Sequence, residues 1–80
     1  MLRLNWKIRT RTDRRFVYEA IHNGYTLKAT TWKGGPGWYV LNWMSERLAV
    51  GYADTVLAAQ EAAEAWMIEM NLLKEEKAHA

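Results

Sequence analysis

The stretch that decides the fold covers residues 16–32 and reads FVYEAIHNGYTLKATTW. Asn23 and Gly24 stand between two runs that are rich in β-branched and aromatic residues, which favour strands. An Asn-Gly pair in this position is the strongest short signal of a two-residue hairpin turn, because both turn residues need a positive φ. The stretch therefore predicts two antiparallel strands, over residues 16–21 and 25–32.

Upstream of this hairpin, apolar and polar residues alternate strictly from residue 2 to residue 9. The apolar positions are Leu2, Leu4, Trp6 and Ile8. Strict alternation is the pattern of a strand with one buried face. We therefore expect a first strand that turns these four side chains toward the core.

Downstream of the hairpin, a glycine-rich break separates it from two more strand-like runs. Residues 33–37 contain three glycines and a proline, which predicts a loop. Alternation then predicts strands over residues 38–44 and 48–52. The two sides of the first of these strands are Trp38, Val40 and Met44, and Tyr39, Leu41 and Trp43.

From residue 54 onward the apolar period changes from two to 3.6, which indicates a helix. Asp54 or Thr55 can cap its N-terminus, and the pattern extends over about residues 55–76. The expected apolar stripe is Val56, Ala59, Ala63, Trp66, Met70 and Leu73. Residues expected off the stripe are Glu61, Glu64, Glu69, Met67, Ile68 and Leu72. The three apolar members of that second set favour a partner or a dimer.

Length and composition bound the class of protein. A chain of 80 residues and 9.3 kDa fits one domain over residues 1–80. Its strands lie within residues 2–52, so we expect an α+β fold: an antiparallel β-meander of four to five strands with one long C-terminal α-helix packed on one face. The absence of cysteine suits a reducing cytoplasm, and no apolar run approaches the roughly 18 residues of a membrane span. We therefore expect a cytoplasmic protein without a membrane partner.

Basic residues concentrate in the first part of the chain. Residues 1–33 contain eight basic and two acidic residues, whereas residues 34–80 contain three basic and seven acidic ones. Around the turn expected over residues 10–15 lie Arg9, Arg11, Arg14 and Arg15. Guanidinium groups pair bidentately with phosphates and carboxylates, so these arginines are candidates for contact with an anionic partner. The alternative is a solvated loop that only improves solubility.

Five Trp, four Tyr and one Phe are many for a core of this size. One helix covers one face of a sheet, so alternation leaves part of one of two sets on the other face: Trp32, Tyr39, Leu41 and Trp43, or Trp38, Val40 and Met44. The candidates for partner contact are Trp32, Trp38, Tyr39 and Trp43. Exposed Trp, Tyr and Arg side chains are enriched at interface hot spots. The alternative is a face closed by self-association or by a long loop.

Patterns for catalysis or metal binding are scarce. The chain has one serine, Ser45, and two histidines, His22 and His79, with no pair at metal-ligand spacing. Residues 33–37 combine a lysine with glycines but lack the Gly-Lys-Ser/Thr ending of a phosphate-binding loop. We therefore expect a protein that is not an enzyme and uses no metal or cofactor.

Part of the chain resembles two families of small nucleic-acid-binding domains. Residues 51–55, Gly-Tyr-Ala-Asp-Thr, and the alanines that follow them resemble the end of the double-stranded RNA-binding domain. That family binds phosphate through lysines at the start of its last helix, where this chain has Val56 and Leu57. The same stretch is similar to the three-strand-plus-helix DNA binders of the AP2 and integrase-arm type, which read the major groove with sheet residues. The side chains that this similarity implies for DNA contact are Arg3, Lys7, Arg9 and Arg11.

The whole profile is similar to that of the small phage and mobile-element inhibitors known as anti-CRISPR proteins. The shared traits are a compact cysteine-free domain, many Trp and Tyr residues, no catalytic residues, and a β-meander with a helix. This resemblance implies a protein that binds a bacterial CRISPR effector complex, in the host cell cytoplasm, and blocks nucleic-acid binding or cleavage by occlusion. We therefore expect a non-enzymatic inhibitor of this type. The alternatives are a small sheet-based DNA- or RNA-binding module and a homodimer.

Overall fold

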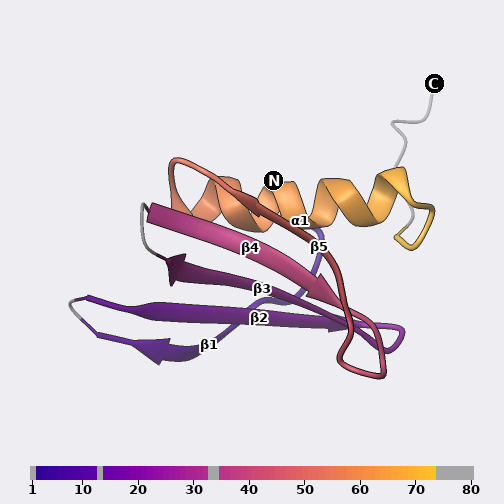
Figure 1. Cartoon of the computed structure of the whole chain (residues 1–80), viewed down its shortest axis with the longest axis horizontal. Helices are drawn as coiled ribbons and strands as arrows, with labels where there is room; N and C mark the ends of the chain where they lie inside the picture. The colour runs from indigo at the N-terminus through magenta and orange to yellow at the C-terminus, as the bar shows by residue number, and fades with distance from the viewer. Residues whose placement is uncertain (1, 13, 33–34, 74–80) are drawn as a thin grey trace.

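The computed structural model describes residues 2–12, 14–32 and 35–73, which form an antiparallel sheet with one helix packed against it (Figure 1). The elements are β1 (Lys7–Arg11), β2 (Phe16–His22), β3 (Tyr25–Trp32), β4 (Gly35–Leu41), β5 (Arg47–Tyr52) and α1 (Val56–Glu69). Each strand pairs with the next one along the chain, in the order β1-β2-β3-β4-β5. The α+β fold expected from the sequence, a β-meander with a helix on one face, is therefore confirmed.

The turn between β2 and β3 has the geometry that its sequence demands. Asn23 has a φ of 50° and Gly24 a φ of 85°, so both occupy the left-handed region that a two-residue hairpin turn requires. His22 pairs with Tyr25 directly beside the turn. This turn sets the register of the central hairpin, and through it the face on which each side chain of β2 and β3 lies.

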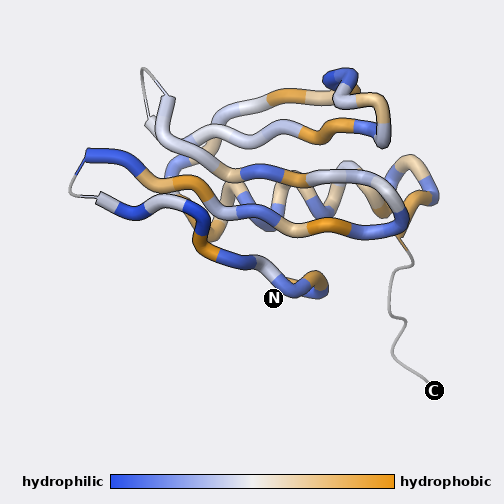
Figure 2. Tube along the Cα trace, turned by 90° about the horizontal axis from the view of Figure 1, so that it is seen from below, coloured by the Kyte–Doolittle hydropathy of each residue, from blue (hydrophilic) through white to orange (hydrophobic). Residues whose placement is uncertain are grey.

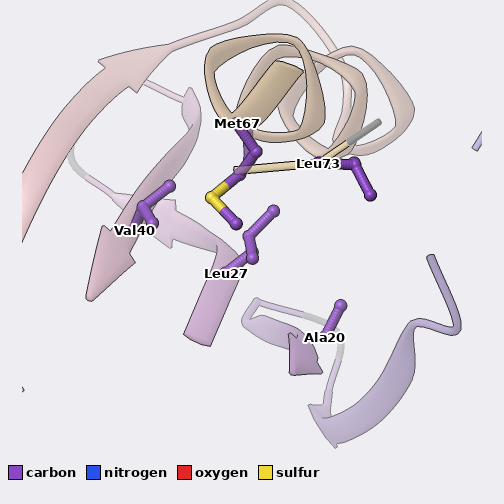
Figure 3. Close-up of a cluster of buried hydrophobic side chains, with 6 residues drawn as sticks. Ala20, Leu27, Val40, Met67 and Leu73 are labelled. Atoms are coloured by element: carbon purple, nitrogen blue, oxygen red, sulfur yellow. The ribbon is translucent and has the colours of Figure 1, made fainter. Parts of the chain in front are cut away.

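The core lies between the sheet and α1. Leu27 of β3 and Val40 of β4 are cross-strand partners, and both pack with Met67 of the helix in the fully buried centre (Figure 3). Ala59 and Ala63 are also fully buried. Because these helix residues are small, the helix backbone can approach the strands closely. Met67 was expected off the apolar stripe as a sign of a partner, and that expectation is wrong.

α1 covers only part of the sheet. Among the described elements it contacts β3, β4 and β5, and it lies away from β1 (Figure 1). Ile8, which was expected to face the core, is 53% exposed because no helix reaches the edge strand on which it lies. Ala20 of β2 is nevertheless buried in the core cluster, which the N-terminal residues Leu4 and Trp6 help to cover.

The N-terminal segment is held by a buried carboxylate and not by strand pairing. The backbone N–H groups of Arg3 and Leu4 donate to Glu64 of α1, over 2.7 and 2.9 Å, and Trp6 Nε1 donates to the same carboxylate over 2.7 Å. Glu64 is only 3% exposed, although the sequence pattern placed it off the buried stripe. The first strand therefore begins at Lys7 and not at residue 2.

The helix begins as expected and ends earlier. Thr55 caps it, because its side chain accepts a hydrogen bond of 3.0 Å from the N–H of Ala58. The helix ends at Glu69, and Asn71 adopts a left-handed φ of 61° that turns the chain back. The prediction of a helix to about residue 76 is therefore wrong for residues 70–73, which are not helical. Residues 74–76 lie outside the described residues.

This early end also corrects the expected apolar stripe. Met70, at the C-cap, is 51% exposed, whereas the reversed chain brings Leu73 into the core cluster. Ile68 and Leu72, which were expected to favour a partner, pack partly buried against the same cluster.

The fourth strand is shifted relative to its prediction over residues 38–44. It begins at Gly35, because Gly35, Pro36 and Gly37 pair with the end of β3 instead of forming a loop. It ends at Leu41, because the side chain of Asn42 accepts hydrogen bonds from the N–H groups of Met44 and Glu46 and closes a turn. Trp43 and Met44 therefore belong to the β4–β5 turn.

In the described part of the chain, no helix has the length and apolar character that a membrane crossing requires.

Candidate functional site

The candidate site is the side of the sheet away from α1, which we call the open face. Leu27 and Val40 point to the helix, so their sequence neighbours Lys28 and Tyr39 point to the opposite side. The registers place one row of side chains across this face: Lys7, Glu19, Lys28, Tyr39 and Val50. α1 packs on the side of Leu27 and Val40, so no described helix covers this row.

Three rings form an aromatic cluster on the open face: Trp32, Tyr39 and Tyr52. Trp32 and Tyr39 lie parallel, with ring centroids 5.8 Å apart and an angle of 2° between their planes. Tyr52 meets Trp32 edge-on at 5.4 Å. These are the favourable arrangements of aromatic quadrupoles, so the cluster is organised before any partner binds.

Gly37 makes room for this cluster. A Cβ atom at residue 37 would lie 2.6 Å from Cε3 of Trp32 and 3.1 Å from two further atoms of the same ring. The indole therefore covers the backbone of β4, and the cross-strand partner of Trp32, Gly35, also has no side chain. The absence of side chains at both positions lets the indole lie low over the strand.

Basic side chains accompany the aromatic cluster on the open face. The guanidinium carbon of Arg47 lies 5.5 Å from the centre of the Tyr39 ring, within range of a cation–π interaction. Arg9 lies at a bulge in β1, and its Nη2 is 2.9 Å from Glu19 Oε1. Lys28 Nζ is 3.6 Å from the other oxygen of Glu19. With Lys7 in register opposite Glu19, the cations on this face outnumber the carboxylate.

A hollow of about 260 Å³ lies beside the Arg9–Glu19 ion pair. Its lining residues are Asn5, Lys7, Arg9, Glu19 and Ile21. The polar and basic lining suits an anionic group better than an apolar one. The open face thus has an aromatic side on β3 to β5, with Arg47 beside it, and a basic side on β1 to β3.

The arginines that the sequence singled out do not form one cluster. Arg9 is on the open face, whereas Arg11 ends β1 and Arg14 and Arg15 lie in the following turn, all exposed. The tip of this hairpin is hydrophilic (Figure 2). Thr12 organises the turn, since its backbone N–H donates to the carbonyl of Arg15 over 2.6 Å and its hydroxyl accepts from the N–H of the same residue.

The aromatic residues that the sequence singled out are also divided. Trp32 and Tyr39 meet in the aromatic cluster. Trp38 lies on the opposite side of the sheet, packed against the core, with its Nε1 close to Gly51. Trp43 is 72% exposed in the β4–β5 turn, outside the cluster.

Tyr52 was missed as a candidate, although a signal for it exists. The small residues Ala49 and Gly51 mark one side of β5, and alternation then places Val50 and Tyr52 on the other side together. Tyr52 is 65% exposed, which makes it the most accessible ring of the cluster.

Comparisons of the chain with protein-family models, with curated proteins and with solved structures found no match. Within residues 2–12, 14–32 and 35–73, no three His, Asp or Glu side chains gather closely enough to hold a metal ion. The expectation of a non-enzymatic protein stays a prediction.

Proposed function

We propose that this protein is a non-enzymatic binding protein that binds nucleic acid through its open face. One observation supports this function above all: basic side chains and an organised aromatic cluster share a sheet face that no described helix covers. Basic residues neutralise phosphates, and aromatic rings offer surfaces on which bases stack.

The positive charge of the open face favours binding to nucleic acid over binding to the channel in which an effector complex holds its nucleic acid. Such channels in effector complexes are themselves positively charged. A face with Lys7, Lys28 and Arg47 would be repelled by the channel and attracted by the nucleic acid itself. Lysine is also depleted in protein–protein interfaces, which gives a second reason for this preference.

The inhibitor of a CRISPR effector complex is the second candidate function. The exposed Trp43 and Met44 of the β4–β5 turn favour it, because Trp anchors and adaptable Met side chains suit protein partners. In this case the protein would cover an acidic surface of the complex. It would then lower cleavage of target DNA by a purified effector at a molar ratio near one, and Trp43→Ala would relieve the inhibition.

Titration of labelled RNA and DNA with the purified protein at physiological salt tests the proposed function. The expected dissociation constant is micromolar or tighter, with a strong dependence on salt. The double variant Lys7→Gln/Lys28→Gln removes two cations from the open face, and Arg11→Gln/Arg14→Gln removes the same charge from the hairpin tip. We expect the first variant to lose more affinity.

Other results of this titration would contradict the proposal. A larger loss in the hairpin variant would move the site to the β1–β2 turn, and no binding by the unmodified protein would refute it. Light scattering at the same concentrations is the control for self-association. A mass of about twice 9.3 kDa that persists when nucleic acid is added would indicate a second copy on the open face.

A further inference from the structure

We propose that the nucleic acid bound by the open face is single-stranded, with its bases on the aromatic cluster and its phosphates toward the basic side at β1 to β3. This inference rests on the proposed function and specifies its ligand. It follows from three features of the face: accessible ring surfaces, cations placed beside them, and a width that a duplex groove does not admit.

The first feature is the access to the rings. A base that stacks on a side chain needs an unpaired π surface, and in a duplex those surfaces are covered by neighbouring bases. Tyr52 is 65% exposed at the end of β5, and its ring meets that of Trp32 edge-on. Trp32 and Tyr39 are half-buried and stack on each other, so Tyr52 is the ring of the cluster that is most open to a base. The cluster therefore offers a stacking surface to the unpaired bases of a single strand.

The second feature is the position of the cations relative to the rings. Lys28 is the cross-strand partner of Tyr39, and Arg47 lies over the same ring. Lys7 is two strands beyond Lys28, roughly 10 Å away at the usual strand spacing. Bases on the cluster thus have phosphate partners within reach along the same row, with the basic hollow at β1 at its far end.

The third feature is the width of the sheet. Five strands span roughly 19 Å from β1 to β5 at the usual spacing, whereas the major groove of B-DNA is about 12 Å wide. A duplex groove could admit only a narrow part of the sheet, such as β1 to β3, and a duplex bound there would leave Tyr39 on β4 and Tyr52 on β5 uncovered. A flexible single strand can follow the open face from the cluster to β1.

Anisotropy titrations with a labelled 12-nucleotide strand, as RNA and as DNA, and with the matching duplex test this inference. RNA and DNA share their phosphates and the stacking surfaces of their bases, so we expect similar affinities for the two single strands. Each should bind at least about ten-fold more tightly than the duplex. Tyr52→Leu removes the most exposed ring, and we expect about five-fold or greater weakening for the single strands. Trp43→Leu is the matched control, because it removes an exposed ring outside the cluster, and we expect no change.

Each contrary result has a distinct meaning. Binding to the duplex alone would overturn the single-strand inference and leave the proposed function intact, and equal loss in Tyr52→Leu and Trp43→Leu would overturn stacking on the cluster. Absence of binding to all three ligands would overturn both proposals. Circular dichroism of each variant checks that the variant is folded, so that a loss of binding is not caused by unfolding. A second variant, Tyr39→Leu, tests the cluster independently, since it also removes the ring beneath Arg47.

Discussion

At the residue scale, the indole of Trp32 occupies the space that a side chain at residue 37 would need. We expect Gly37→Ala to destabilise the protein by about 1–3 kcal/mol, because the new methyl group would overlap the indole. Urea unfolding measures this loss. In a Trp32→Leu background the same substitution should cost clearly less, and an undiminished cost would show that the indole is not its cause.

Glu64 provides the second residue-scale prediction. Its two oxygens accept hydrogen bonds from Arg3, Leu4 and Trp6, and a glutamine in its place would turn an N–H group toward at least one of these donors. We expect Glu64→Gln to lower the free energy of unfolding by about 1–3 kcal/mol and to speed hydrogen exchange at residues 3 and 4. Glu69→Gln, an exposed position on the same helix, is the matched control. Equal effects of both variants would contradict the assigned role.

These residues also mark the limits of reading the site from the sequence. Local alternation suffices to place Tyr39 away from the helix, and it could have placed Tyr52 beside it. No local pattern announces that Glu64 is buried, because its partners lie at the other end of the chain. Alternation also predicts Trp38 and Tyr39 on opposite sides, whereas the start of β4 was not predictable, because Gly35, Pro36 and Gly37 have the composition of a loop.

At the element scale, the end of α1 depends on Asn71. A non-glycine residue in the left-handed region costs about 1–2 kcal/mol, and asparagine tolerates that region better than most residues. We therefore expect Asn71→Ala to lower stability by about 1 kcal/mol and Asn71→Gly to leave it nearly unchanged. Thermal unfolding distinguishes the two. If alanine were neutral here, the reversal of the chain after the helix would not depend on this residue.

The elements themselves follow the sequence to different degrees. The β2–β3 hairpin was predictable because the requirement of its turn for positive φ is local chemistry. The helix N-terminus was predictable from its capping residue, Thr55. Its C-terminus was not, because the apolar period continues through Leu73 while the chain reverses to bury that side chain. Local periodicity does not distinguish a longer helix from a folded-back end.

At the scale of the whole molecule, the sheet and the helix carry different charge. Of the described basic residues in the first part of the chain, all but Arg3 lie on β1 to β3 and the hairpin tip, whereas α1 carries Glu61, Glu64 and Glu69 and no basic residue within its bounds. Meander order was predictable because consecutive strands usually pair. The extent of helix coverage was not, since it depends on how α1 and the N-terminal segment share one side of the sheet.

This charge arrangement predicts a specific dependence on salt. Each phosphate contact to a single strand contributes about 0.7 to the slope of log affinity against log salt concentration. We expect Lys7→Gln/Lys28→Gln to reduce that slope by about 1.4, while Tyr52→Leu weakens binding and leaves the slope unchanged. An unchanged slope in the lysine variant would contradict phosphate contact by these side chains.

The attachment of the N-terminal segment to Glu64 has a consequence for the synthesis of the chain. The hydrogen bonds concerned join residues that are 58 to 61 positions apart. A ribosome releases the strands one after another, and each can pair with its predecessor at once. The first residues, however, reach the Glu64 carboxylate only after the helix has emerged. Nascent chains that stop before α1 therefore present Leu27 and Val40 to the solvent, and the core forms only after α1 has been translated.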